Sequence, residues 1–206
     1  MKQVLSQLLQ KIELYAGEER FAQELERAKE KFFNPVGFAS ENGEIAELEL
    51  ANFIEWFIFD WKLEQDKSLW EKFLEEKGDE LELIEKETLK EFSSQKYSLF
   101  LVKKIAPGQA KVKDLLSKEK FNPVYGLSAG IEKGDFILAR IVFPAGQACF
   151  TEAFFYLPRT LAKFYQKKAR LVRKKQLEKD KFLEELRSIA IKFQRYPRMK
   201  LEEYYQ

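Results

Sequence analysis

The spacing of apolar residues changes twice along this chain, and this constrains the fold more than any other feature of the sequence. Up to residue 92, apolar residues recur three or four positions apart, as at Leu5, Leu8 and Ile12, which is the spacing of amphipathic helices. Residues 97–157 are instead rich in strand-forming residues, and after Pro158 the helical spacing returns. The sequence therefore predicts an α+β fold with helices, then strands, then helices.

The central segment predicts a small β-barrel. It contains about five short runs with the composition of strands, at residues 97–105, 109–116, 119–125, 136–143 and 147–157. Turn residues such as Pro107, Gly108, Gly134 and Gly146 lie between them. Five short strands joined by tight turns are typical of a five-stranded antiparallel β-barrel of the OB or SH3-like kind.

Local signals predict where the helices lie. Ser68 and Glu71 have the spacing of a capping box, which predicts a helix that buries Trp70, Phe73 and Leu74. A helix from about Glu44 is expected before it. After Pro158, two helices with a break near Lys179 are expected. Their apolar faces are predicted at Leu161, Tyr165, Ala169 and Val172, and then at Phe182, Leu186, Ile189 and Phe193.

The charge of the chain is unevenly distributed. The 36 basic and 34 acidic residues give a net charge of only +2. Counted along the sequence, residues 1–96 carry a net −10, residues 97–157 a net +3 and residues 158–206 a net +9. We therefore expect three regions, namely an acidic helical region, a small β-barrel and a basic C-terminal helical tail.

The composition excludes several kinds of chemistry. The chain has no His and a single Cys, Cys149, which removes Ser–His and Cys–His nucleophiles and zinc sites built on His or clustered Cys. None of the glycines forms a phosphate-binding loop followed by Lys-Ser or Lys-Thr. We therefore assign no catalytic residue, no metal and no cofactor, although carboxylate-bound magnesium remains open.

The compartment is predicted from the same composition. No stretch approaches the roughly 20 apolar residues that a membrane span requires, and the N-terminus lacks the apolar core of a signal peptide. One Cys cannot form an internal disulfide, so we expect a cytoplasmic protein that has no membrane partner. Abundant Lys and Glu with sparse Asn and Cys resemble the composition of thermophile proteins.

Roughly half of the chain resembles a bacterial family. The stretches FIEWFIFDWKL (53–63), LWEKFLEEKGDEL (69–81), YSLFLVKKIAPGQAKVKDLLSKEKF (97–121) and GIEKGDFILARIVFPAG (130–146) are similar to proteins that carry a SEC-C motif. The resemblance implies a helical and barrel architecture, with Trp56, Asp60, Gly134, Asp135 and Arg140 in matching places. The Cys-rich zinc motif of that family has no counterpart, because residues 158–206 contain neither Cys nor His. Zinc binding is therefore not expected.

A basic stripe is the strongest functional signal in the sequence. Lys163, Lys167, Arg170 and Lys174 share one face of the predicted helix, and Arg173 and Lys175 lie beside them. Such a face can neutralise phosphates, and next to an OB-like barrel it indicates RNA or single-stranded DNA. The alternative interpretation, which we place slightly ahead, is that the stripe balances the protein's own acidic helices.

Other candidate residues have a structural interpretation beside the functional one. Arg140 lies alone among apolar residues of a predicted strand, so it is either a further nucleic-acid contact or the partner of Asp135 or Asp114 in an ion pair. Aromatic residues of the barrel are either stacking platforms or core, the core being the commoner case: Phe100, Phe121, Tyr125, Phe136 and Phe150. Carboxylates occur at Glu41, Glu44, Glu47, Glu49, Glu55 and Asp60.

Three functions remain open. The leading expectation is a non-catalytic binding or adaptor protein that acts through contacts with an unknown protein partner. The alternative is binding of RNA or single-stranded DNA by the barrel and the basic C-terminal helix. A carboxylate- and metal-dependent, nuclease-like enzyme is the distant third, because the acidic spacing is that of solvated helix faces.

Overall fold

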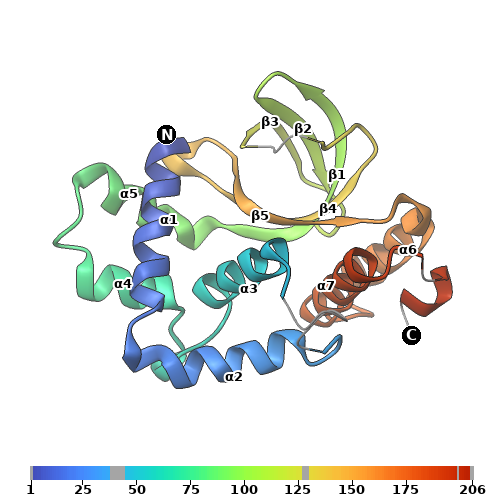
Figure 1. Ribbon diagram of the computed structural model, residues 1–206. Helices are drawn as coiled ribbons and strands as arrows, with labels where there is room; N and C mark the ends of the chain where they lie inside the picture. The colour runs from blue at the N-terminus through green and yellow to red at the C-terminus, as the bar shows by residue number, and fades with distance from the viewer. Residues whose placement is uncertain (1, 38–44, 127–129, 199, 205–206) are drawn as a thin grey trace. The chain divides into compact units, whose positions relative to one another are not determined.

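A computed structural model describes residues 2–37, 45–126, 130–198 and 200–204 of the chain. Its helices and strands are labelled in Figure 1. The described chain divides into two compact units. Unit 1 contains residues 1–95 and the short segment 143–146, and unit 2 contains residues 96–142 and 147–206. The C-terminal helices belong to the same unit as the β-strands.

Unit 1 is helical, as the apolar spacing predicts. Its helices are α1 (Lys2–Ala16), α2 (Ala22–Phe33), α3 (Glu47–Phe59), α4 (Leu69–Lys77) and α5 (Leu83–Glu91). Phenylalanines of α2 and α3 are part of its core, with the rings of Phe32 and Phe53 5.4 Å apart. The predicted capping box is confirmed, because the Ser68 backbone amide donates to Glu71 Oε2 at 2.7 Å at the start of α4.

Unit 2 contains a closed barrel of five strands. The strands are β1 (Lys96–Ala106), β2 (Gln109–Asp114), β3 (Lys120–Tyr125), β4 (Phe136–Val142) and β5 (Cys149–Leu157). They are hydrogen-bonded in the order β1-β2-β3-β5-β4, and β4 returns to β1. The order β4-β1-β2-β3 is a Greek key, the arrangement of the OB kind of five-stranded barrel.

One pairing in the barrel differs from the prediction. The barrel was expected to be antiparallel throughout, but β3 and β5 pair in parallel, with Tyr125 opposite Cys149. The Greek-key connection causes this, because β4 intervenes between them in the sequence and so β5 runs in the direction of β3. The Tyr125 amide donates to the Ala148 carbonyl at 3.0 Å and helps to close the barrel. The barrel is therefore mixed.

Two helices follow β5, as expected. Pro158 precedes a single turn at Arg159–Leu161, and α6 (Ala162–Arg173) continues from it. Helix α7 (Lys179–Arg195) begins where the break was predicted, and it packs mainly on β5 and β4 (Figure 1). Phe182, Leu186 and Ile189 are buried on α7. Helix α7 also contacts β4, in which every residue from Phe136 to Val142 is buried.

Among the described residues, no helix is both long enough and apolar enough to cross a membrane.

Candidate functional site

Helix α6 has the two faces that the sequence predicts. Tyr165 and Ala169 are fully buried, and the Tyr165 ring packs on Phe136 of β4 at 5.2 Å between ring centroids. On the other side of the helix, the basic residues are exposed, among them Lys163, Lys167 and Arg170. The apolar face thus fixes α6 against the barrel and leaves its cations at the surface.

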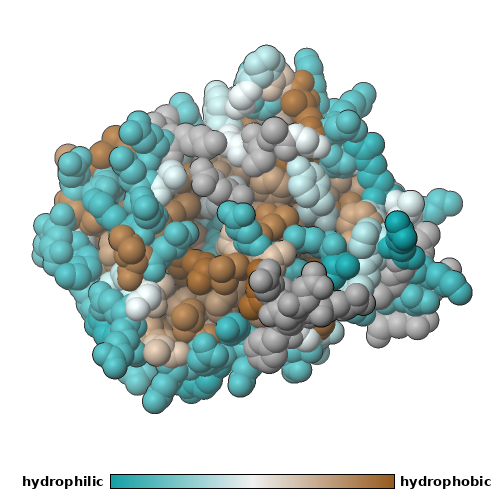
Figure 2. Space-filling model, in the orientation of Figure 1, coloured by the Kyte–Doolittle hydropathy of each residue, from teal (hydrophilic) through white to brown (hydrophobic). Residues whose placement is uncertain are grey.

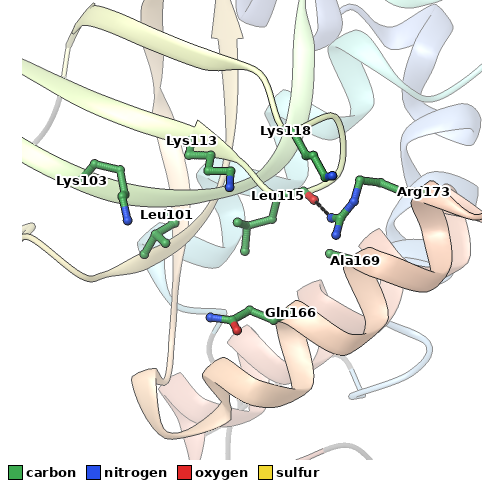
Figure 3. Close-up of a pocket in the computed structure, with 8 residues that line it drawn as sticks. All are labelled: Leu101, Lys103, Lys113, Leu115, Lys118, Gln166, Ala169 and Arg173. Atoms are coloured by element: carbon green, nitrogen blue, oxygen red, sulfur yellow. Dashed lines mark hydrogen bonds between the residues drawn. The ribbon is translucent and has the colours of Figure 1, made fainter.

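A cleft of about 360 Å³ lies between α6 and the first two strands of the barrel. Leu101, Leu115 and Ala169 give it an apolar lining. Its polar residues are Gln166 and four cations, which are Lys103, Lys113, Lys118 and Arg173. Figure 3 shows that the lysines belong to the barrel side of the cleft, whereas Gln166, Ala169 and Arg173 project from α6. We call this space the inner cleft.

A second, more open hollow adjoins the inner cleft. It has a volume of about 760 Å³ and is lined by Leu116, Ser117, Lys118, Arg170, Arg173 and Lys174. Lys118 and Arg173 line both spaces. The two therefore form one continuous feature, the basic groove, whose lining includes six cations and no carboxylate: Lys103, Lys113, Lys118, Arg170, Arg173 and Lys174.

The six cations of the basic groove have no carboxylate within ion-pair distance in the parts of the chain that the structure describes. Other cations of the same unit are paired. Lys168 lies 3.0 Å from Glu185, and Arg159 lies 2.6 Å from Asp135 and 2.9 Å from Glu132. Like charges that face a shared concave space add their fields, so the basic groove is a local region of positive potential.

A buried carboxylate positions one wall of the groove. Asp114 ends β2 and is 4% exposed. Its Oδ1 accepts hydrogen bonds from Ser98 Oγ at 2.6 Å and from the Leu116 amide at 2.7 Å, and its Oδ2 accepts one from Ser117 Oγ at 2.7 Å. These bonds hold the turn between β2 and β3 in the form that carries Lys118 into both spaces of the groove.

The two walls are also joined directly. The Arg173 guanidinium donates a hydrogen bond from Nη1 to the backbone carbonyl of Leu115 in the same turn (Figure 3). Lys118 itself has a positive φ of 69°, and its amide donates to the Asp114 carbonyl at 3.0 Å. The turn therefore fixes the Arg173 side chain and the backbone of Lys118 before any ligand arrives.

The structure separates the predicted basic residues into three sets. Arg170, Arg173 and Lys174 line the basic groove. Lys163, Lys167 and Lys175 are exposed but line neither of its two spaces. Arg140 is fully buried, and its guanidinium lies 4.9 Å from the centroid of the Tyr97 ring. Neither Asp135, which pairs with Arg159, nor Asp114, which holds the turn, is a partner of Arg140.

Sequence reasoning missed the barrel half of the groove. Isolated lysines in a β segment are usually solvated. The sequence therefore did not indicate a binding role for Lys103, Lys113 or Lys118. The available signal was the alternation at Lys111, Val112 and Lys113, which points two lysines away from the barrel core. Lys113 reaches α6 because it pairs opposite Leu101 on β1. The register of a strand pair cannot be read from the sequence alone.

The other candidates fall mostly in the core. Phe100, Phe121, Phe136 and Phe150 are buried, whereas Tyr125 is 37% exposed, so the core interpretation is confirmed for four of the five aromatics. Cys149 is buried. Glu41 and Glu44 lie outside the described residues, and within the described ranges no three His, Cys, Asp or Glu side chains form a group that could hold a metal ion.

Comparison with known proteins gives one match. A model of a family of unknown function, DUF7986, matches residues 1–190. No curated protein matches the chain, and neither does any solved structure.

Proposed function

We propose that this chain, which belongs to the DUF7986 family of unknown function, binds RNA or single-stranded DNA along the basic groove. The observation that carries the proposal is the set of six cations that share one concave surface without a carboxylate partner among the described residues. Nucleic-acid backbones present phosphates at short, regular intervals, and each phosphate that is neutralised releases condensed counterions. Of the functions left open by the sequence, this geometry therefore favours the second.

Charge reversal on the barrel wall tests the proposal. The double variant Lys113→Glu/Lys118→Glu replaces two groove cations and leaves α6 unchanged. Binding of a fluorescent ten-nucleotide RNA or DNA, followed by anisotropy, is expected to weaken at least tenfold, about 1.4 kcal/mol. The wild-type affinity is expected to fall steeply with salt, with a slope of up to about −4 in log K against log salt concentration if all six cations meet phosphates.

A matched control makes the same change in net charge at a site outside the groove. Lys179→Glu/Lys181→Glu changes the net charge equally, but on the first turn of α7, where acidic residues suit the helix dipole. This variant is expected to bind like the wild type. Absence of salt-dependent oligonucleotide binding by the wild type, or equal losses in the two variants, would refute binding through the groove.

The adaptor function stays a prediction that has its own support in unit 1. Leu14 on α1 is 73% exposed, and Leu83 and Ile84 at the start of α5 are 74% and 51% exposed. Hydrophobic residues are visible at the surface over the part of the molecule that carries α1 and α5 (Figure 2). Apolar side chains exposed in this way are typical of protein contacts. Leu14→Asp/Leu83→Asp is expected to abolish any such contact without affecting oligonucleotide binding.

Two finer expectations from the sequence also stay predictions. The resemblance to SEC-C-containing proteins implies a shared helical and barrel region, and the family match neither names that family nor tests the resemblance. The cytoplasmic location rests on the single Cys, which cannot form an internal disulfide.

A further inference from the structure

The inner cleft differs chemically from the rest of the basic groove. Three of its eight lining residues are apolar, namely Leu101, Leu115 and Ala169. The open hollow instead combines Leu116 and Ser117 with four cations. A backbone of phosphates and sugars needs the cations but gains nothing from a recessed apolar lining. The inner cleft is therefore suited to a group that has an apolar face and is attached to a phosphate backbone.

Gln166 adds a polar group with both a donor and an acceptor. It projects from α6 into the inner cleft beside Leu101 and Leu115 (Figure 3). Its side-chain amide has no hydrogen-bond partner among the residues that the structure describes. An amide in this position can pair with the donor and acceptor on the edge of a nucleobase.

We propose that the inner cleft receives one unpaired base of a nucleic-acid strand, with Gln166 hydrogen-bonded to the base edge. This inference rests on the proposed function and specifies that the ligand is a single-stranded nucleic acid. The backbone next to that base lies along Lys118 and Arg173, which line both the inner cleft and the open hollow. The bases of a duplex are stacked and paired, so they cannot enter a recessed cleft, whereas those of a single strand can be splayed out.

The lining also predicts how selective the site is. No aromatic residue is among the lining residues of either space in the described chain, so bases are not held by ring stacking. Leu101, Leu115 and Ala169 contact any base face in a similar way, and one amide can rotate to match different edges. We therefore expect a strand with bases to bind clearly more tightly than an abasic strand. Among the four bases we expect only a small difference in affinity.

Abasic oligonucleotides test the proposal without altering the protein. A ten-nucleotide strand of abasic units has the phosphates of oligo-dT but no bases. Oligo-dT and oligo-U are each expected to bind at least fivefold more tightly than the abasic strand at the same salt concentration. A duplex of the same length is expected to bind less tightly than oligo-dT, because its bases are paired. Equal affinity for oligo-dT and the abasic strand, or for oligo-dT and the duplex, would overturn the proposal.

Gln166→Ala localises the effect to the inner cleft. Alanine is a good helix former, so α6 is expected to fold unchanged. The variant is expected to lose about threefold in affinity for oligo-dT, the scale of one hydrogen bond of modest net strength, and nothing for the abasic strand. Gln194→Ala, at an exposed glutamine on α7, is the matched control and is expected to bind both strands normally. An unchanged preference for oligo-dT in Gln166→Ala would remove Gln166 from the site.

The two proposals fail in different ways. If neither oligo-dT, oligo-U nor the abasic strand binds, nucleic-acid binding itself is refuted. If all three bind equally and with the expected salt dependence, the backbone function stands and only the base site is refuted. Efficient displacement of oligo-dT by an equal concentration of thymidine monophosphate would indicate a mononucleotide site and would likewise overturn the strand assignment.

Discussion

Asp114 shows how a single buried residue sets the geometry of a surface site. A buried carboxylate normally requires a cation, but here hydrogen bonds from Ser98, Leu116 and Ser117 satisfy its oxygens. The Leu115 carbonyl in the same turn is then available to the Arg173 guanidinium. One buried acidic residue therefore orders a wall whose groove-lining charges are all positive.

Asp114→Asn is expected to loosen this wall. An Asn side chain keeps one acceptor oxygen but places an NH2 group where hydrogen-bond donors now point, so the free energy of unfolding should fall by about 1–2 kcal/mol. The substitution also makes the unit more positive, which by charge alone would strengthen the binding of an anion. We nevertheless expect oligonucleotide affinity to fall about threefold, because the backbone of Lys118 and the side chain of Arg173 are no longer held in place.

Thermal unfolding and anisotropy measure these two effects separately. Ser98→Ala is the control, since it removes one hydrogen bond of the network and leaves the turn amides bonded. Affinity that rises in Asp114→Asn would mean that charge, and not the order of the turn, governs binding.

Asp114 also marks a limit of sequence reasoning at the scale of the residue. In the sequence it is one of two candidate partners for Arg140, the other being Asp135. The structure instead pairs it with Ser98, 16 positions earlier, through the register of β1 and β2. The structural role of Asp114 depends on the conformation of the turn that follows it. The sequence does not specify that conformation, above all the positive φ of Lys118.

Pairs of elements are joined by few but specific contacts, and α1 with α5 is the clearest case. Lys11 Nζ lies 2.6 Å and 2.7 Å from the two carboxylate oxygens of Glu85. The Glu85 side chain is only 8% exposed, whereas that of Lys11 is 46% exposed. The hydrogen bond from Lys11 lowers the pKa of Glu85, and the hydrogen bond from the Glu82 amide acts in the same direction. This pair helps to hold α5 on α1.

The lowered pKa of Glu85 predicts a pH dependence of stability. Because the folded protein holds the charged carboxylate more strongly than the unfolded chain does, the contribution is fully present above the ordinary glutamate pKa of about 4.3. It is lost as the pH falls through the lower pKa of the folded state. Glu85→Gln is therefore expected to cost about 1 kcal/mol at pH 7, a value reduced by the exposure of Lys11, and progressively less below about pH 4.

Urea unfolding at several pH values measures this difference. Asp79→Asn is the matched control, because Asp79 pairs with Lys86 at 2.7 Å but its side chain is fully exposed. That variant is expected to show no measurable change at pH 7. A Glu85→Gln penalty that stays constant down to pH 3 would contradict the assigned cause.

Elements were predicted well where the evidence is local and poorly where it is not. The apolar spacing placed α6 and α7, and the Ser68–Glu71 signal placed the start of α4. The parallel pairing of β3 with β5 escaped prediction, because it depends on which strands become neighbours. The basic groove was not predicted for the same reason. Half of its cations come from β1, β2 and the turn that follows, and which strands lie beside α6 is a property of the fold.

At the scale of the whole molecule, the small net charge of +2 conceals strong local fields. At physiological ionic strength the Debye length is about 8 Å, so exposed charges farther apart than this hardly influence one another. A nearly neutral protein can therefore attract a polyanion to one groove. Under this view the positions of the cations determine binding, and their total number does not.

Two variants of α6 with equal net charge separate position from number. Arg170→Glu/Lys174→Glu reverses two groove cations, and Lys163→Glu/Lys167→Glu reverses two exposed cations outside the groove. At 0.15 M salt the first is expected to weaken oligonucleotide binding at least tenfold and the second about twofold or less. At 0.01 M salt, where the Debye length reaches about 30 Å, the two losses should approach each other. Equal losses at 0.15 M salt would mean that the whole basic stripe, and not the groove, binds the strand.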